Sequence, residues 1–129
     1  MNTVDQPATP KVRYHQDAYR FVFESLHHTQ QKLKRTLTPD IEDEQAHITG
    51  PELLHGIREL ALERYGQLSK NVFAHWGVKS TADFGRIVFE LIERGEMRKT
   101  ERDQLRDFFN VYDFEDALER DYAITVQNR

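Results

Sequence analysis

The sequence predicts a mainly α protein, folded as a compact single-domain bundle of five or six helices. The first observation is size and composition: 129 residues, 38% hydrophobic and 31% charged, are typical of one globular domain. The second is that apolar residues recur at helical spacing in several stretches. The third is that the six glycines stand singly, and we interpret each as a helix cap or a break between helices.

The chain is predicted to begin with an arm and a long first helix. Residues 1–10 are mostly polar and include two prolines, so we expect 1–12 to be a mobile arm. The helical domain is expected over 13–126, and 127–129 form a tail. No Gly or Pro interrupts 14–34, which predicts one helix with a wide apolar face. That face consists of Ala18, Phe21, Val22 and Leu26, with Tyr19 and Phe23 beside it.

The next helix carries the strongest local signal in the chain. Thr49 is followed three residues later by Glu52, with Pro51 between them, which predicts a capping box and a helix start. Gly66 is expected to divide the following apolar pattern into one helix ending near residue 65 and another ending near Trp76. Gly77 is then expected to cap the second piece in the left-handed conformation.

The last third of the chain predicts one strong helix and several short elements. Ser80 or Thr81 is expected to cap a helix that Gly95 ends, and its apolar positions match the helical template. These positions are Phe84, Ile87, Val88, Leu91 and Ile92. Thr100 begins a short charged segment, and Asp113 is expected to cap a final short helix. Alternation over 122–126 leaves a minor β element or an extended arm near the C-terminus as alternatives.

Several classes of chemistry are excluded by residue content. The chain has no cysteine, which excludes disulfides, thiol catalysis and thiolate metal sites. No apolar run approaches the ~20 residues of a membrane span, and no secretion signal is evident, so we expect a cytoplasmic protein. Phosphate-binding glycine motifs, a serine elbow and the zinc-protease motif are missing. We therefore expect no cofactor and no membrane association.

Two Glu-x-x-His pairs imitate part of a di-iron site. Glu24 with His27, and Glu52 with His55, have the spacing that di-iron bundles use on two helices. Because Glu52 is better explained as the cap partner of Thr49, we favour a reading with no metal site. A small metal-binding protein or enzyme that uses His47, His55, Glu24 or Glu52 remains the alternative.

Charge argues against nucleic acid as the partner. The net charge is −4, and the helix expected over 81–94 offers few bases for a recognition surface. A nucleic-acid or ribosome-associated factor is a further alternative, with 78–99 as a winged-helix-like segment that ends in a basic run. Its phosphate contacts would come from Arg20, Lys32, Lys34 and Arg35 on the first helix.

Aromatic content favours a binding role. Aromatic residues make up 11% of the chain, and Phe89 lies about 140° from Phe84 around their helix. Either this helix is buried on two sides, or Phe89 belongs to an apolar surface patch that meets a partner. We favour a non-enzymatic protein-interaction module that binds another protein or forms a homodimer.

Three sequence runs resemble a family of small uncharacterised proteins. The runs are HITGPELLHGIR (47–58), WGVKSTADFGRIVF (76–89) and VYDF (111–114), and the family occurs chiefly in planctomycete and verrucomicrobial bacteria. The resemblance implies a bacterial, cytosolic, single-domain protein whose family has no assigned activity. The candidate interaction or functional surface comprises His47, Glu52, His55, Arg58, Trp76, Asp83, Phe89 and Asp113. We expect Glu52, Asp83 and Asp113 to cap helices, Trp76 to fill core, and His47 to bond backbone at a loop exit.

Overall fold

The computed structural model describes residues 14–35 and 47–120, and this part of the chain is helical. Its α-helices are α1 (Gln16–Lys32), α3 (Gly50–Tyr65), α4 (Ser69–His75) and α5 (Thr81–Glu93). Its shorter elements are the 3-10 turns η1 (Gly66–Leu68) and η2 (Leu105–Phe108) and the π-helical turn η3 (Glu115–Arg120). The mainly α prediction is confirmed, whereas the count of five or six helices is wrong: four α-helices form within the described residues.

The last quarter of the chain contains no regular α-helix within the described residues, although the sequence predicts a final short helix after Asp113. The segment that begins at Thr100 contains only the four-residue turn η2, and the segment after Asp113 is the six-residue η3. Phe108 and Phe114 dock their rings into the core, so the chain follows the core surface instead of continuing a helix. The described residues contain no strand, and the β element expected over 122–126 lies outside them, as do the predicted arm 1–12 and tail 127–129.

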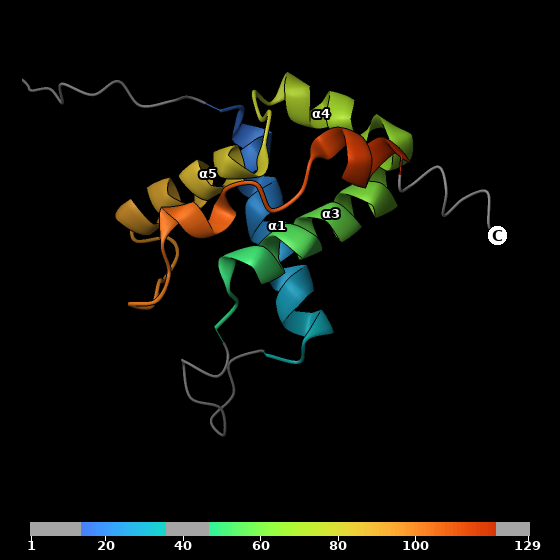
Figure 1. The fold of residues 1–129 in the computed structure, drawn as a ribbon. Helices are drawn as coiled ribbons and strands as arrows, with labels where there is room; N and C mark the ends of the chain where they lie inside the picture. The colour runs from blue at the N-terminus through green and yellow to red at the C-terminus, as the bar shows by residue number, and fades with distance from the viewer. Residues whose placement is uncertain (1–13, 36–46, 121–129) are drawn as a thin grey trace, which may run out of the picture.

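The helices pack around one core (Figure 1). In this view α1 runs behind α3, and the two helices are in direct contact along their crossing. Helix α5 packs against α1 on the left, and α4 lies at the top next to the carboxyl end of α3. The turns η2 and η3 cover the front, where η2 contacts α5 and α3, and η3 contacts α4 and α3.

Local sequence signals set the helix ends. The capping box at Thr49 is confirmed: the Glu52 backbone N–H donates to Thr49 Oγ1, and Glu52 Oε1 accepts the Thr49 N–H at 3.0 Å. Gly66 ends α3 and separates it from α4, as predicted. Gly77 follows α4 with φ of 84°, a left-handed conformation in which a β-carbon costs about 1–2 kcal/mol.

Two glycines contradict the expectation that every glycine caps or breaks a helix. Gly56 and Gly85 lie inside α3 and α5 and are buried. A β-carbon at residue 85 would lie 2.6 Å from Phe108 Cβ, and one at residue 56 would overlap the Thr29 hydroxyl. These glycines therefore allow α5 to approach η2 and α3 to approach α1.

The core is rich in aromatic rings. Phe73 is central: its ring centroid lies 5.0 Å from that of Phe84, 5.7 Å from that of Trp76 and 5.4 Å from that of Phe114. Trp76 is 5% exposed, which confirms its predicted place in the core. In the part of the chain that the structure describes, no helix is both long enough and apolar enough to cross a membrane.

Candidate binding site

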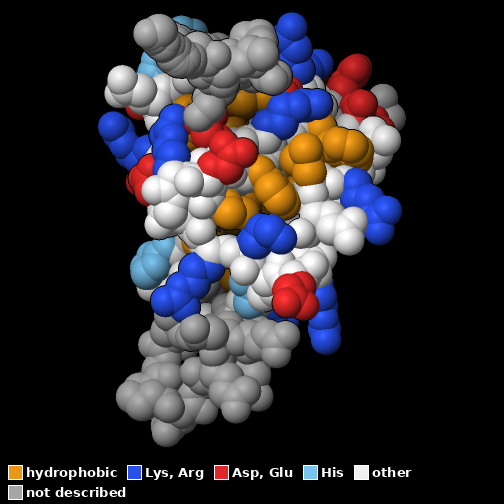
Figure 2. Space-filling view, turned by 90° about the vertical axis from the view of Figure 1, so that its left-hand side faces the viewer, with side chains coloured by type: hydrophobic (Ala, Val, Ile, Leu, Met, Phe, Trp, Pro, Cys, Tyr) orange, Lys and Arg blue, Asp and Glu red, His pale blue; other side chains and the backbone are white. Residues whose placement is uncertain are grey.

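A cavity of about 490 Å³ opens between α1, the start of α3, α5 and the segment 95–103, which we call the strap. Its volume lies within the range of about 300–1,000 Å³ that is usual for ligand sites. The walls are mainly apolar and include Leu26, Leu53, Val88, Ile92, Met97 and Phe108. On the face shown in Figure 2, hydrophobic side chains gather near the middle, with Lys, Arg, Asp and Glu side chains around them.

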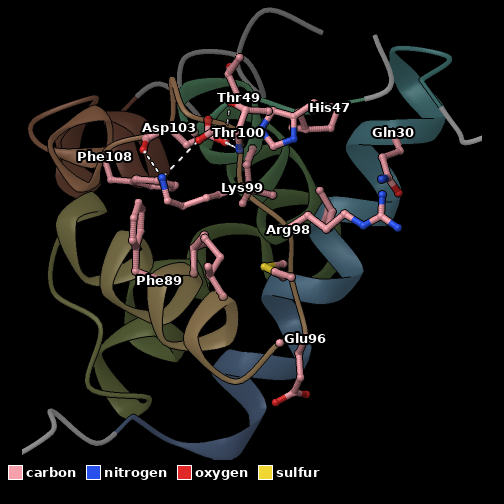
Figure 3. Close-up of a pocket in the computed structure, with 18 residues that line it drawn as sticks. Gln30, His47, Thr49, Phe89, Glu96, Arg98, Lys99, Thr100, Asp103 and Phe108 are labelled. Carbon is pink, nitrogen blue, oxygen red and sulfur yellow. Dashed lines mark hydrogen bonds and ion pairs between the residues drawn. The ribbon is translucent and has the colours of Figure 1, made fainter. Parts of the chain in front are cut away.

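The strap is attached to the domain at both ends. At its start, the backbone N–H groups of Glu96 and Met97 donate to Leu91 O at 2.9 and 3.2 Å, where α5 ends. Its far end forms a turn within the strap itself, in which the Thr100 N–H donates to Asp103 Oδ2 at 2.8 Å, and Asp103 contacts His47 outside the strap. The strap thus leaves α5, crosses the cavity and meets the chain that enters α3 (Figure 3).

His47 connects the strap to the entrance of α3. Its Nε2 lies 2.6 Å from Asp103 Oδ2, and the two side chains are only 21% and 15% exposed. Nε2 makes no well-aligned hydrogen bond, so this is a close contact between an imidazole and a carboxylate and does not meet the geometry of a hydrogen bond. We expected His47 to bond backbone at a loop exit; its imidazole instead meets a carboxylate, while its backbone carbonyl accepts from Arg35 at 3.4 Å.

The strap side chains diverge around the cavity. Figure 3 shows Lys99 running toward Phe108 on one side, Arg98 extending toward Gln30 on the other, and Glu96 pointing away at the far end. The Lys99 ammonium donates to the backbone carbonyls of Thr100 and Asp103, each at 3.3 Å. Two consecutive cations therefore flank the cavity from opposite sides of the strap.

Among the residues singled out from sequence, His47 and Phe89 line this cavity. The Phe89 ring is half-buried and stands edge-on to Phe108, with centroids 6.3 Å apart. Glu52 lies nearby in the capping box, where both carboxylate oxygens accept from Arg35 Nη1 at 2.7 and 2.8 Å. Burial raises the pKa of Glu52, but hydrogen bonds from Thr49 and Arg35 outweigh burial, and the net pKa is lowered.

The other predicted site residues lie elsewhere and complete the fold. The His55 ring packs near Tyr112, and Arg58 Nε donates to Ala117 O at 3.0 Å, which ties α3 to η3. Asp113 accepts the backbone N–H groups of residues 115 and 116, as expected of a cap. Asp83 caps the start of α5 and also accepts the Tyr14 hydroxyl at 2.6 Å. The eight predicted residues thus do not form one site.

The structure separates the two Glu-x-x-His pairs. Glu24 pairs with Arg64 at 2.7 Å and Glu52 pairs with Arg35, so each carboxylate has a cation as its neighbour. Within residues 14–35 and 47–120, no three His, Asp or Glu side chains are grouped closely enough to hold a metal ion.

Basic side chains of α1, and Arg35 just after it, are paired with carboxylates. The pairs are Arg20 with Asp17, Lys32 with Glu59 and Arg35 with Glu52. The nucleic-acid alternative stays a prediction.

Sequence reasoning missed most of the residues that form the cavity. Met97, Lys99 and Asp103 were not singled out as site residues, although 97–99 had been noted as a basic run after a helix. Thr100 and Asp103 have the three-residue spacing of a capping box, so the turn between them could have been predicted from the sequence. Nothing in the sequence indicates that His47 meets this turn, because 56 positions separate His47 from Asp103.

No protein-family model, curated protein or solved structure matches this chain. The resemblance of the runs in 47–58, 76–89 and 111–114 to a bacterial family stays a prediction.

Proposed function

We propose that this protein is a non-enzymatic interaction module that binds an apolar segment of a partner protein in the cavity beneath the strap. The observation that carries the proposal is the uncovered apolar lining of a surface cavity of about 490 Å³. Phe89, Ile92 and Met97 are only partly buried, although they pack against the core. Covering such surface releases about 25 cal/mol per Å² of apolar area.

The polar groups around the cavity support binding over catalysis. His47 and Asp103 have the chemistry of an acid–base pair, but Asp103 Oδ2 also accepts the N–H and the hydroxyl of Thr100. The Thr100 hydroxyl itself accepts from the Arg102 N–H at 3.2 Å. These groups therefore hold the strap in shape, and none is arranged as an activated nucleophile beside a base.

Selection from a random 12-residue peptide library displayed on phage tests the proposal. The full chain is immobilised, and selection is repeated on Met97→Asp and on the milder Met97→Ala. Leu68→Asp is the matched control, because Leu68 is apolar, 61% exposed and absent from the cavity lining. Circular dichroism checks that each variant is folded.

We expect the wild-type chain and Leu68→Asp to enrich the same peptides, each with at least two large apolar residues. Met97→Asp should bind these peptides at least tenfold more weakly, because a carboxylate in an apolar lining opposes apolar ligands. Light scattering on the unliganded chain tests the alternative that a second copy fills the cavity. Failure to enrich any peptide, or equal binding by Met97→Asp, would refute the proposed function.

A further inference from the structure

The strap is a loop whose two ends are anchored close together. It leaves the carboxyl end of α5 at Gly95 and leads into η2 after Asp103. Helix α5 and η2 pack directly on each other, because Gly85 lets the Phe108 side chain approach α5. The strap extends below these two elements at the left of Figure 1. A compact loop with ends so close can move as one unit while both of its anchors stay in place.

Gly95 supplies a hinge at the α5 end of the strap. The Gly95 N–H donates to Ile92 O at 3.0 Å and the Glu96 N–H donates to Leu91 O at 2.9 Å, a hydrogen-bond pattern that requires a left-handed residue between them. The φ angle of Gly95 is 76°, and a β-carbon added there would meet no atom within 4 Å. Glycine adopts positive and negative φ about equally readily, so Gly95 can change the direction in which the strap leaves α5.

The contact between His47 and Asp103 acts as a latch at the other end. The hydrogen bonds of Lys99, Thr100 and Arg102 described above stay within the strap. Asp103 instead reaches outside the strap, where its Oδ2 lies 2.6 Å from His47 Nε2 at the entrance of α3. A carboxylate attracts a ring N–H at this distance, and the attraction is stronger because both side chains are largely withdrawn from water.

The closed latch does not satisfy the hydrogen-bonding needs of its groups. His47 Nε2 is buried without a well-aligned hydrogen bond, which is unfavourable for a polar atom. Opening of the strap would return Nε2 and the Asp103 carboxylate to water, and this gain in hydration opposes their mutual attraction. Met97, half-buried against the core, adds an apolar contact that favours the closed form. Opposing contributions of this kind leave the strap poised between closed and open forms.

From these features we infer that the strap is a lid: it swings about Gly95, the contact between His47 and Asp103 latches it closed, and its opening admits ligands to the cavity. The inference rests on the proposed function for what enters the cavity, whereas the opening itself is a property of the unliganded chain. When only the open form binds, the apparent affinity for a ligand falls in proportion to the open fraction. The latch therefore regulates binding without touching the ligand.

A single introduced thiol measures the opening of the lid. The chain has no cysteine, so Met97→Cys places one thiol at a half-buried position of the strap. The neutral reagent 4,4′-dithiodipyridine reacts with this thiol when the strap opens, and the absorbance of the released thione gives the rate. Two reference chains carry one thiol elsewhere: Leu68→Cys at a position that is 61% exposed, and Val22→Cys at a fully buried position that becomes accessible on unfolding.

Removal of the latch is the decisive comparison. His47→Phe keeps a ring at this position but removes both nitrogens, and we expect it to speed labelling of the Met97→Cys thiol by roughly tenfold. Asp103→Asn should act in the same direction, because the charge is lost while the amide oxygen can still accept the Thr100 N–H. If the two groups act only on each other, the double variant should label no faster than the faster single variant.

The hinge and the control complete the set of variants. Gly95→Ala should also speed labelling of the Met97→Cys thiol, because a β-carbon disfavours the left-handed conformation of the closed form. His55→Phe is the matched control for His47→Phe: His55 is exposed on α3 and is not part of the cavity lining, so labelling should not change.

Each outcome supports or overturns the lid. An unchanged labelling rate of the Met97→Cys thiol in His47→Phe and Asp103→Asn overturns it. Equal acceleration at the Val22→Cys thiol also overturns it, because the whole domain would then be opening.

Labelling uses no ligand, so its result is independent of the proposed function. Stopped-flow fluorescence then follows binding of a labelled peptide from the displayed library, which should associate faster with His47→Phe than with the wild-type chain. Equal association rates overturn control of entry by the lid. Absence of any enriched peptide refutes the proposed function, and the labelling rates alone then decide whether the strap opens.

Discussion

Replacing Gly56 by alanine tests how closely α1 and α3 pack. Gly56 lies in the middle of α3 and faces Thr29 of α1. A β-carbon added there would overlap Thr29 Oγ1 and would lie 3.1 Å from Thr29 Cβ. Thr29 is 4% exposed, and its hydroxyl donates to Ser25 O at 2.7 Å, so the side chain has little freedom to move.

Two effects of opposite sign decide the magnitude. Alanine is a better helix former than glycine by about 1 kcal/mol, which favours the variant. Overpacking of a close-packed core costs about 1–3 kcal/mol, and rotation of the hydroxyl alone leaves the Thr29 β-carbon too close. Because the added β-carbon would directly overlap Thr29, we place the overpacking cost in the upper part of that range, at about 2–3 kcal/mol. After the gain in helix propensity, Gly56→Ala should lower the free energy of unfolding by about 1–2 kcal/mol.

Urea unfolding followed by circular dichroism at 222 nm measures this change. Thr29→Ala removes the overlapping hydroxyl, so the double variant should recover at least about 1 kcal/mol relative to the sum of the single variants. Asn71→Ala is the propensity control: it is exposed on α4 and should gain a few tenths of a kcal/mol. A Gly56→Ala chain as stable as the wild type, or additive single effects, would show that the two helices are not in this close contact.

Three further predictions concern polar and backbone features. Glu52→Gln should destabilise the chain by about 1 kcal/mol at pH 7. The pKa of Glu52 is lowered from its ordinary 4.5, so the stability that Glu52 contributes is present above pH 4.5 and is lost as the pH falls through the lowered pKa. Thermal unfolding at pH 7 and pH 3 measures the difference in stability between the wild-type chain and Glu52→Gln. A difference that did not change with pH would contradict the pairing with Arg35. Tyr112→Phe removes the hydrogen bond from the Tyr112 hydroxyl to Leu54 O and should cost about 1 kcal/mol. Burial raises the pKa of Tyr112, so the stability lost in Tyr112→Phe should be constant below pH 10 and should shrink above pH 10. Urea unfolding at pH 7 and pH 11 measures this loss. A loss that grew with pH would contradict the hydrogen bond to Leu54. Gly77→Ala should lower the free energy of unfolding by about 1–2 kcal/mol, because φ is 84° at this position. Thermal unfolding measures the loss. A variant as stable as the wild-type chain would mean that residue 77 adopts a different backbone conformation.

Local features of the fold were predictable because they depend on neighbours in sequence. The capping box at Thr49 and Glu52, the division of helices at Gly66 and the cap at Gly77 each rest on hydrogen bonds or dihedral angles within a few residues. The final short helix predicted from the Asp113 cap is the π-helical turn η3, and the charged segment that begins at Thr100 contains only the 3-10 turn η2. Burial of Phe108 and Phe114 decides their shape, and that burial is a property of the folded core.

The candidate site was only partly predictable. Phe89 was identified from its angle to Phe84, and that angle is fixed by helix geometry alone. The partnership of His47 with Asp103 joins residues on two separate segments, and no spacing rule links them. Likewise, Glu52 was predicted as a cap, whereas its pairing with Arg35 required α1 to end beside the start of α3.

The sequence alone thus determined where the long helices start and end and which face of each is apolar, since these features depend on interactions over three or four residues. Only the tertiary structure decided that the strap crosses an apolar cavity and brings Lys99, Arg98 and His47 to its rim. The physical reason is the close packing of α1, α3 and α5. Gly56 permits α3 to pack closely on α1, and Gly85 permits η2 to pack closely on α5. This packing fixes which distant side chains meet.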